Sequence, residues 1–89
     1  LNMNRLGGLI AAFVVHSVVQ SSWAVQIPLS HALLQETVLH MRCEQALLTL
    51  RFETSDWNAR ETLMQHMPAL LRRLHQSLPQ LVNVIWVTD

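Results

Sequence analysis

The sequence predicts an α+β domain, in which a four-stranded sheet with a central β-hairpin is packed by a long Pro-kinked helix and an N-terminal helix. Three observations predict this fold class. Two segments of alternating apolar and polar residues follow each other almost directly, as the strands of a hairpin do. An apolar stripe at steps of three and four residues then indicates an amphipathic helix. A last apolar segment predicts one more strand.

The first predicted element is a helix within residues 1–21. Apolar residues recur there with helical spacing, and Asn4 is available as the N-cap. A pair of glycines and several valines lower the helix propensity of this segment. The segment also resembles the apolar core of a signal peptide, with Ser22-Trp23-Ala24 as a candidate cleavage site. Its apolar run stops at His16, short of the ~20 residues that cross a bilayer, and this favours a packed helix.

Three strands and a tight turn are predicted next. Residues 22–27 alternate in polarity, and Pro28 either places this strand at an edge of the sheet or ends it there, because proline cannot donate to a strand ladder. Residues 37–43 and 46–53 alternate in the same way, with only Glu44-Gln45 between them, although the usual Asn-Gly turn is missing. On the polar side of this hairpin, Arg42 and Arg51 are expected to face Glu44 and Glu53.

The long helix and the last strand complete the sheet. Thr54-Ser55-Asp56 supplies an N-cap for the helix. Pro68 lies inside the helical pattern, removes one backbone hydrogen bond and predicts a kink. Residues 81–87 are apolar at nearly every position, which is typical of a strand buried on both faces in the interior of a sheet. The apolar stripe of the helix consists of Leu63, Met67, Leu70, Leu71, Leu74 and Leu78.

Length and charge limit the domain organisation and the class of partner. Eighty-nine residues suffice for one domain (1–89), with residues 1–21 as its first helix and 22–89 as the core α+β unit, expected to be the C-terminal fragment of a longer protein. The net charge is zero and all basic residues are Arg, which argues against nucleic acids and acidic membranes as partners. Only 13% of the residues are charged, which indicates exposed apolar surface for protein contacts. Small domains also expose apolar area without any partner.

Catalytic and metal-binding patterns are not found in the sequence. The five histidines lack the spacing of three or four residues that would bring two of them together on a helix, so no metal site is expected. They are expected at the surface or at the boundary of the core, where histidines can tune an interface. Cys43 falls on the apolar side of its strand and is expected to pack as a small hydrophobic residue. With no nucleophile elbow and no phosphate-binding loop, the sequence predicts neither an enzyme nor a cofactor.

Residues for contact with a partner are sought on the long helix. Trp23 and Trp86 lie on predicted strands and are expected in the core. Trp57, in the first turn of the helix, is either a binding anchor or a cap over the edge of the core, and the cap is favoured. The outward side of the helix carries further candidates for partner binding, and an ordinary solvated face is the simpler alternative. These candidates are Arg60, Arg72 and Arg73.

The hairpin and the long helix also carry a resemblance to a known family. The segments that carry it are Leu48-Thr49-Leu50-Arg51-Phe52, Ala59-Arg60-Glu61-Thr62-Leu63 and Met67-Pro68-Ala69-Leu70. Residues 25–87 resemble the C-terminal domain of flagellar hook-length control proteins and, more closely, the needle-length regulators of bacterial type III secretion systems. Leu71 stands where that pattern has an Arg, and the loop before the hairpin lacks its Leu-Gly. Both departures favour the needle branch over the hook branch.

The resemblance implies a substrate-specificity switch domain. Such a domain controls needle length and changes which substrates are exported, by binding the cytoplasmic domain of the autocleaving export-gate protein and other export-apparatus proteins. It implies a monomer that acts in the bacterial cytoplasm and is then exported through the secretion channel, without membrane insertion. The alternative is a dimeric module similar to a secretion chaperone, with the apolar first helix as its dimer face. A small enzyme would require a deep polar pocket that holds two or more histidines.

Overall fold

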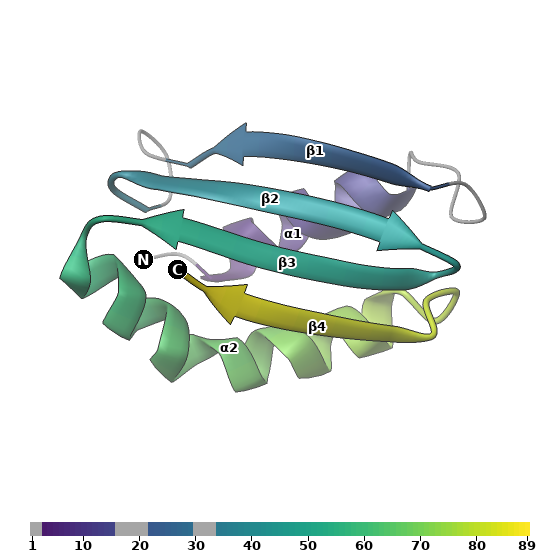
Figure 1. Cartoon of the computed structure of the whole chain (residues 1–89). Coiled ribbons are helices and arrows are strands. Elements are labelled where there is room, and N and C mark those ends of the chain that lie inside the picture. The colour runs from purple at the N-terminus through teal and green to yellow at the C-terminus, as the bar shows by residue number, and fades with distance from the viewer. Residues whose placement is uncertain (1–2, 16–21, 30–33) are drawn as a thin grey trace.

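The computed structural model describes residues 3–15, 22–29 and 34–89. The strands stand in the order β1-β2-β3-β4, antiparallel from β1 to β3, with β4 parallel to β3. Both helices lie against one face of this sheet (Figure 1). The predicted α+β class, with two helices and a four-stranded sheet, is confirmed. The elements are α1 (Met3–Val15), β1 (Trp23–Pro28), β2 (Thr37–Glu44), β3 (Leu47–Thr54), α2 (Trp57–Ser77) and β4 (Asn83–Thr88).

The turn between β2 and β3 consists of Gln45 and Ala46. Both residues have positive φ, 51° and 64°, as the two central residues of a type I′ hairpin turn require. Such a turn matches the right-handed twist of the strands that it joins. The turn lies one residue later than the sequence predicted, because Glu44 still pairs with Leu47. Alternation along the strands had nevertheless identified their inner faces correctly, since Cys43 pairs with Leu48 and both are fully buried.

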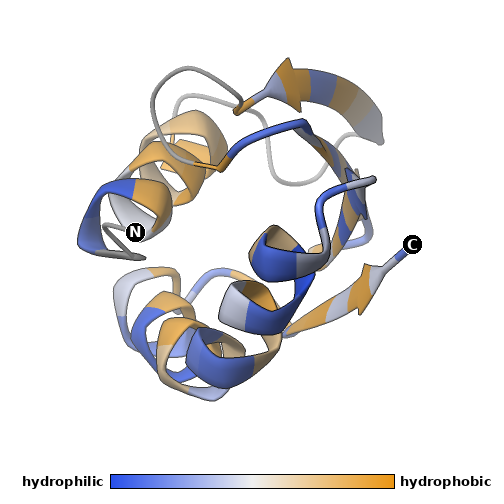
Figure 2. Ribbon diagram, turned by 90° about the vertical axis from the view of Figure 1, so that its left-hand side faces the viewer, coloured by the Kyte–Doolittle hydropathy of each residue, from blue (hydrophilic) through white to orange (hydrophobic). Residues whose placement is uncertain are grey.

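The core lies between the sheet and the two helices. Figure 2 shows both helices on the same side of the sheet, with hydrophobic and hydrophilic residues alternating along the strands. Because the strand period is two, one face of each strand supplies apolar side chains to this layer and the other face points away from the helices. The fully buried side chains include Leu39 and Met41 of β2, Leu50 and Phe52 of β3, Leu63, Met67 and Leu74 of α2, and Leu6, Ile10 and Val14 of α1.

Helix α1 packs closely on α2 through a glycine. Gly7 is buried, and a Cβ atom added to it would lie 3.1 Å from Leu70 Cδ1, so a larger residue would require the Leu70 side chain to shift. Arg73 of α2 donates a hydrogen bond to the side-chain oxygen of Asn4 across the same contact. Asn4 is therefore not the N-cap that the sequence predicted, because α1 already begins at Met3. The predictions for residues 16–21 lie outside the described residues.

Helix α2 begins and ends at recognisable caps. Asp56 is the N-cap, and its carboxylate accepts a hydrogen bond from the Asn58 N–H at 3.0 Å. At the other end, the Leu78 N–H donates to the Leu74 carbonyl. The helix runs through Pro68 without interruption, and this residue lies on the exposed side. The kink at Pro68 stays a prediction.

The position of β4 corrects one prediction. The sequence was interpreted as an interior strand buried on both faces, but β4 is the last strand of the sheet. The physical reason is topological: β2 already occupies one side of β3, so the strand that returns after α2 pairs on the other side. Its outer residues Ile85 and Val87 are 44% and 49% exposed. The prediction that β1 lies at an edge is confirmed.

The left-handed turn residue Ala46 offers a stability test. An L-residue with a side chain loses about 1 kcal/mol or more in this region, and glycine does not. Ala46→Gly is therefore expected to raise the free energy of unfolding by about 1 kcal/mol in urea titrations. The matched control is Ala69→Gly on the exposed side of α2, which is expected to lower it by about 1 kcal/mol. A loss of stability in both variants would contradict the assigned turn.

Candidate protein-interaction site

The face of the sheet opposite the helices carries most of the polar side chains of the strands. No described helix covers this open face (Figure 2). Arg51 of β3 pairs in register with His40 of β2 on one side and with Val87 of β4 on the other. Gln26 of β1 extends the same row, since it pairs with His40. A depression of about 510 Å³ lies over this row, and further lining residues include Ala24, Arg42 and Thr49.

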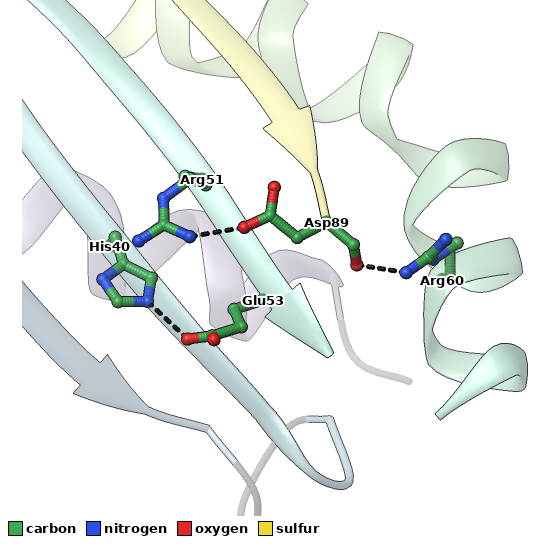
Figure 3. Close-up of polar contacts among 5 residues, drawn as sticks. All are labelled: His40, Arg51, Glu53, Arg60 and Asp89. Carbon is green, nitrogen blue, oxygen red and sulfur yellow. Dashed lines mark hydrogen bonds and ion pairs between the residues drawn. The ribbon is translucent and has the colours of Figure 1, made fainter. Parts of the chain in front are cut away.

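The basic groups of the open face are paired with acids. Arg42 lies 2.5 Å from the Glu44 carboxylate, and His40 Nε2 lies 2.9 Å from Glu53 Oε1. The sequence correctly placed the two arginines and the two glutamates on one side of the hairpin. Arg51, however, forms its ion pair with Asp89 instead of a glutamate (Figure 3). Since the ion pairs of Arg42 and Arg51 are exposed, each contributes only about 0–1 kcal/mol to stability.

Asp89 connects the end of β4 to two other elements. Its carboxylate binds Arg51 of β3, and its backbone oxygen accepts a hydrogen bond from Arg60 of α2 (Figure 3). Sequence reasoning missed this residue, although one signal was available: Asp89 continues the outward alternation of Ile85 and Val87. Only the parallel placement of β4 beside β3 brings that position next to Arg51.

Trp57, Arg60 and Met64, termed the α2 flank, lie along one side of α2. Their spacing of three and four residues places them on one stripe of the helix. Trp57 is 66% exposed and Met64 58%. The Arg60 guanidinium lies 5.7 Å from the centre of the Trp57 ring, in a cation–π contact. Since Arg60 also binds Asp89, the α2 flank adjoins the end of β4.

The structure brings together only two of the four residues that the sequence proposed for partner binding. Trp57 and Arg60 contact each other through the cation–π interaction. Arg72 is exposed elsewhere on α2, on the side opposite the buried stripe. Arg73 points to α1, where it binds Asn4.

The other two tryptophans differ from Trp57. Trp23 and Trp86 are half-buried and pack against the core, as expected. The centre of the Trp23 ring lies 5.5 Å from the centre of the Phe13 ring. Its indole Nε1 is buried and has no hydrogen-bond partner among the described residues.

Groups that often carry chemistry are dispersed in the described part of the chain. His66 and His75 are exposed on α2, whereas His40 lies on the open face. His16 and His31 lie outside the described residues. No group of three or more His, Cys, Asp or Glu in residues 3–15, 22–29 and 34–89 is arranged to hold a metal ion. The two described helices are also too short or too polar to cross a membrane.

Cys43 is a buried thiol on the inner face of β2. Burial raises the pKa of the Cys43 thiol above its ordinary value of 9.0, and a backbone hydrogen bond with Ala46 lowers it to a smaller extent. A neutral, inaccessible thiol is a poor nucleophile, because the reactive form is the thiolate. In the described structure, Cys43 packs in the core between the sheet and the helices.

The fold is a two-layer α+β domain. Its described surface carries the ion pairs of the open face and the exposed side chains of the α2 flank. Residues 2–87 match the family described as Type III secretion protein (HpaP). The chain therefore belongs to the HpaP family of type III secretion proteins. This confirms the connection with type III secretion that the sequence predicted. The match also includes the first helix, which the resemblance had left out.

One curated relative is similar over most of this chain. The "HRP-associated protein" of Ralstonia nicotianae (strain ATCC BAA-1114 / GMI1000) is 32% identical over 83 residues, which make up 90% of this chain and 42% of that protein. The chain thus spans less than half the length of this relative. No solved structure is significantly similar to the chain.

The buried thiol predicts how stability depends on pH. The sequence contains neither Lys nor Tyr, so Cys43 is the one side chain whose ordinary pKa lies between those of His and Arg. Its folded-state pKa is raised, so the contribution of Cys43 to the free energy of unfolding is expected to be lost as the pH rises from the ordinary pKa of a thiol through the raised folded-state pKa. Cys43→Ala is expected to abolish this slope in urea titrations at several pH values. An equal slope in both proteins would contradict the assignment.

Proposed function

We propose that this chain is a substrate-specificity switch domain, a non-enzymatic regulator that controls needle length in type III secretion. It acts by binding the cytoplasmic domain of the export-gate autoprotease, and this event changes which substrates are exported. Membership of the HpaP family supports the secretion context. The observation that carries the docking step is the α2 flank, where an exposed tryptophan and a positioned arginine lie next to the end of β4.

The α2 flank has the physical features of a binding anchor. A tryptophan that is 66% exposed contributes little to the core, but its large rigid surface gains much free energy when a partner covers it. The Arg60 side chain is already held by Trp57 and by the Asp89 backbone oxygen. Less side-chain entropy is therefore lost when a partner binds. We propose Trp57, Arg60 and Arg72 as partner contacts and assign Arg73 to the contact between the helices.

The mechanism is a docking event that shifts the equilibrium of a two-state partner. The free energy for the shift comes from the difference between the affinities of this domain for the two states of the export gate. No bond is made or broken in this step. The domain acts as a monomer in the bacterial cytoplasm and is afterwards exported through the secretion channel. In the longer protein, the preceding segment would measure the needle.

The structure does not favour the alternative of a dimeric chaperone-like module. That alternative used the apolar first helix as a dimer face. In α1, one side consists of Leu6, Ile10 and Val14, which are fully buried against the rest of the domain, whereas Val15 is exposed. The same side of the helix is therefore not available for a second copy.

Deletion of residues 1–89 from the native protein tests the proposed function in the cell. Without the switch domain, needles are expected to grow to uncontrolled lengths, and late substrates are expected not to be exported on schedule. Needle lengths would be measured by electron microscopy and export by immunoblots of culture supernatants. Needles of normal length together with timely export of late substrates would contradict the proposal.

The α2 flank is tested by binding measurements in solution. Trp57→Ala is expected to weaken binding to the cytoplasmic domain of the export gate by about 2 kcal/mol, or about 30-fold, in calorimetric titrations. Arg42→Ala is the control, because Arg42 is also exposed but lies on the open face of the sheet. It is expected to bind like the wild type. Equal weakening by both substitutions would argue against the α2 flank.

A further inference from the structure

The outer edge of β4 is an unpaired part of the sheet. β4 pairs with β3 on one side, and no described strand lies on the other. In a parallel ladder the backbone groups of successive residues point alternately to the two sides. The Asp89 N–H donates to the Phe52 carbonyl at 2.9 Å, so the odd-numbered residues of β4 point to β3. The backbone groups of Val84, Trp86 and Thr88 consequently point outward.

The outward groups form a short template for another strand. The Val84 N–H is already bonded to the side-chain oxygen of Asn83 at 2.8 Å. The outer edge of β4 therefore presents the N–H groups of Trp86 and Thr88, together with the outward carbonyl groups of β4. Edge strands of natural proteins are usually protected by charged residues or proline. β4 contains neither, whereas the opposite edge strand β1 ends in Pro28.

Apolar side chains flank this edge on both faces of the sheet. On the open face, Ile85 and Val87 are about half exposed. On the helix side, Trp86 is half-buried, and the α2 flank contributes the exposed Trp57 and Met64. The side chains of an added strand alternate between the two faces. Both of its rows would therefore cover apolar surface.

We propose that an extended, uncharged and largely apolar segment of a partner protein pairs with β4 as a fifth strand. This inference rests on the proposed function, because the segment belongs to the export-gate domain to which the switch domain binds. The composition of β4 favours this chemistry. Asn83–Thr88 carries no charge, and Ile85 and Val87 are about half exposed, so a charged segment would lose hydration without gaining an ion pair from β4. Strand addition gives affinity through the backbone and specificity through alternate side chains.

A second copy of this chain fits the same edge less well than a single extended segment. In both views α2 lies behind β4 and reaches beyond its outer edge (Figures 1 and 2). Two β4 strands paired about a two-fold axis would lie about 4.8 Å apart. Their two α2 helices would meet on the same side of the sheet, where packed helices need axes about 8–10 Å apart. A single extended segment has no helix behind it and avoids this clash.

Amide hydrogen exchange tests the pairing residue by residue. The ¹⁵N-labelled chain would be measured by NMR alone and in complex with the cytoplasmic domain of the export gate from the same secretion system. In the complex, the Trp86 and Thr88 amides are expected to exchange at least about 10-fold more slowly, because they gain hydrogen bonds. The Ile85 and Val87 amides already donate to β3 and serve as internal controls with much smaller changes.

A charge placed on the edge provides a second test. Ile85→Lys replaces an exposed side chain whose register partner is the neutral Thr49, and it is expected to weaken binding at least about 10-fold. The matched control is Gln26→Lys, which places the same charge on the open face of the opposite edge strand. It is expected to bind like the wild type. Circular dichroism would confirm that both variants are folded.

The outcomes separate this inference from the proposed function. Strand addition is supported if the Trp86 and Thr88 amides exchange slowly in the complex, and if Ile85→Lys binds weakly while Gln26→Lys binds like the wild type. A complex that forms with both amides unprotected and with full affinity of Ile85→Lys overturns strand addition and leaves the docking function in place. The absence of any complex overturns both. Protection that rises with the concentration of the free chain assigns the edge to a second copy and overturns the inference.

Discussion

Burial of only one face of the sheet is the constraint on which the rest of the structure depends. The inner residues of β2 and β3 are fully buried under α1 and α2, and this apolar layer contains the whole described core. Because strand residues alternate, the same constraint fixes which side chains point away from the helices. The hairpin therefore places its arginines and glutamates on the open face, where Arg42 pairs with Glu44, Glu53 with His40 and Arg51 with Asp89. A shift of one residue in register would exchange the two faces and destroy the core.

The sequence predicted the hairpin and α2 well because both have a strict periodicity. Alternation in β2 and β3 identified the buried Cys43 and the exposed Arg42, and the stripe in α2 identified its buried side. β4 was misinterpreted because an apolar composition does not distinguish an interior strand from an edge strand whose outer face is exposed. Only the topology decides this, since β2 already occupies one side of β3.

The candidate site was predictable in part for the same reason. Trp57 and Arg60 lie at the start of α2, and the helical pattern placed Arg60 on the outward side. Trp57 was interpreted as a cap over the edge of the core, whereas the structure leaves it 66% exposed. The ion pair of Arg51 with Asp89 was not predictable, because its residues are 38 positions apart and meet only when β4 pairs with β3. Arg73 was grouped with the exposed arginines, and the sequence did not show that α1 packs beside it. Local periodicity assigns faces, whereas contacts between distant segments require the assembled sheet.

The unpaired edge of β4 lies on the same side of the molecule as the exposed apolar side chains of α2 and β4. The α2 flank, the edge of β4 and the apolar residues of β4 adjoin one another, and Asp89 links them through Arg60 and Arg51. For a member of the HpaP family, this is where docking in the secretion apparatus is proposed. A small domain keeps little stability in reserve. A surface already ordered by the fold lets such a domain bind without a large loss of entropy.

The three tryptophan indole N–H signals provide the most direct measurement of where docking occurs. Trp57 lies on the α2 flank and Trp86 on β4, whereas Trp23 lies on β1 at the opposite edge of the sheet. In an NMR titration with the cytoplasmic domain of the export gate, the Trp57 and Trp86 signals are predicted to shift while the Trp23 signal stays in place. A shift of the Trp23 signal alone, or no shift at saturating partner, would contradict docking at this side of the domain.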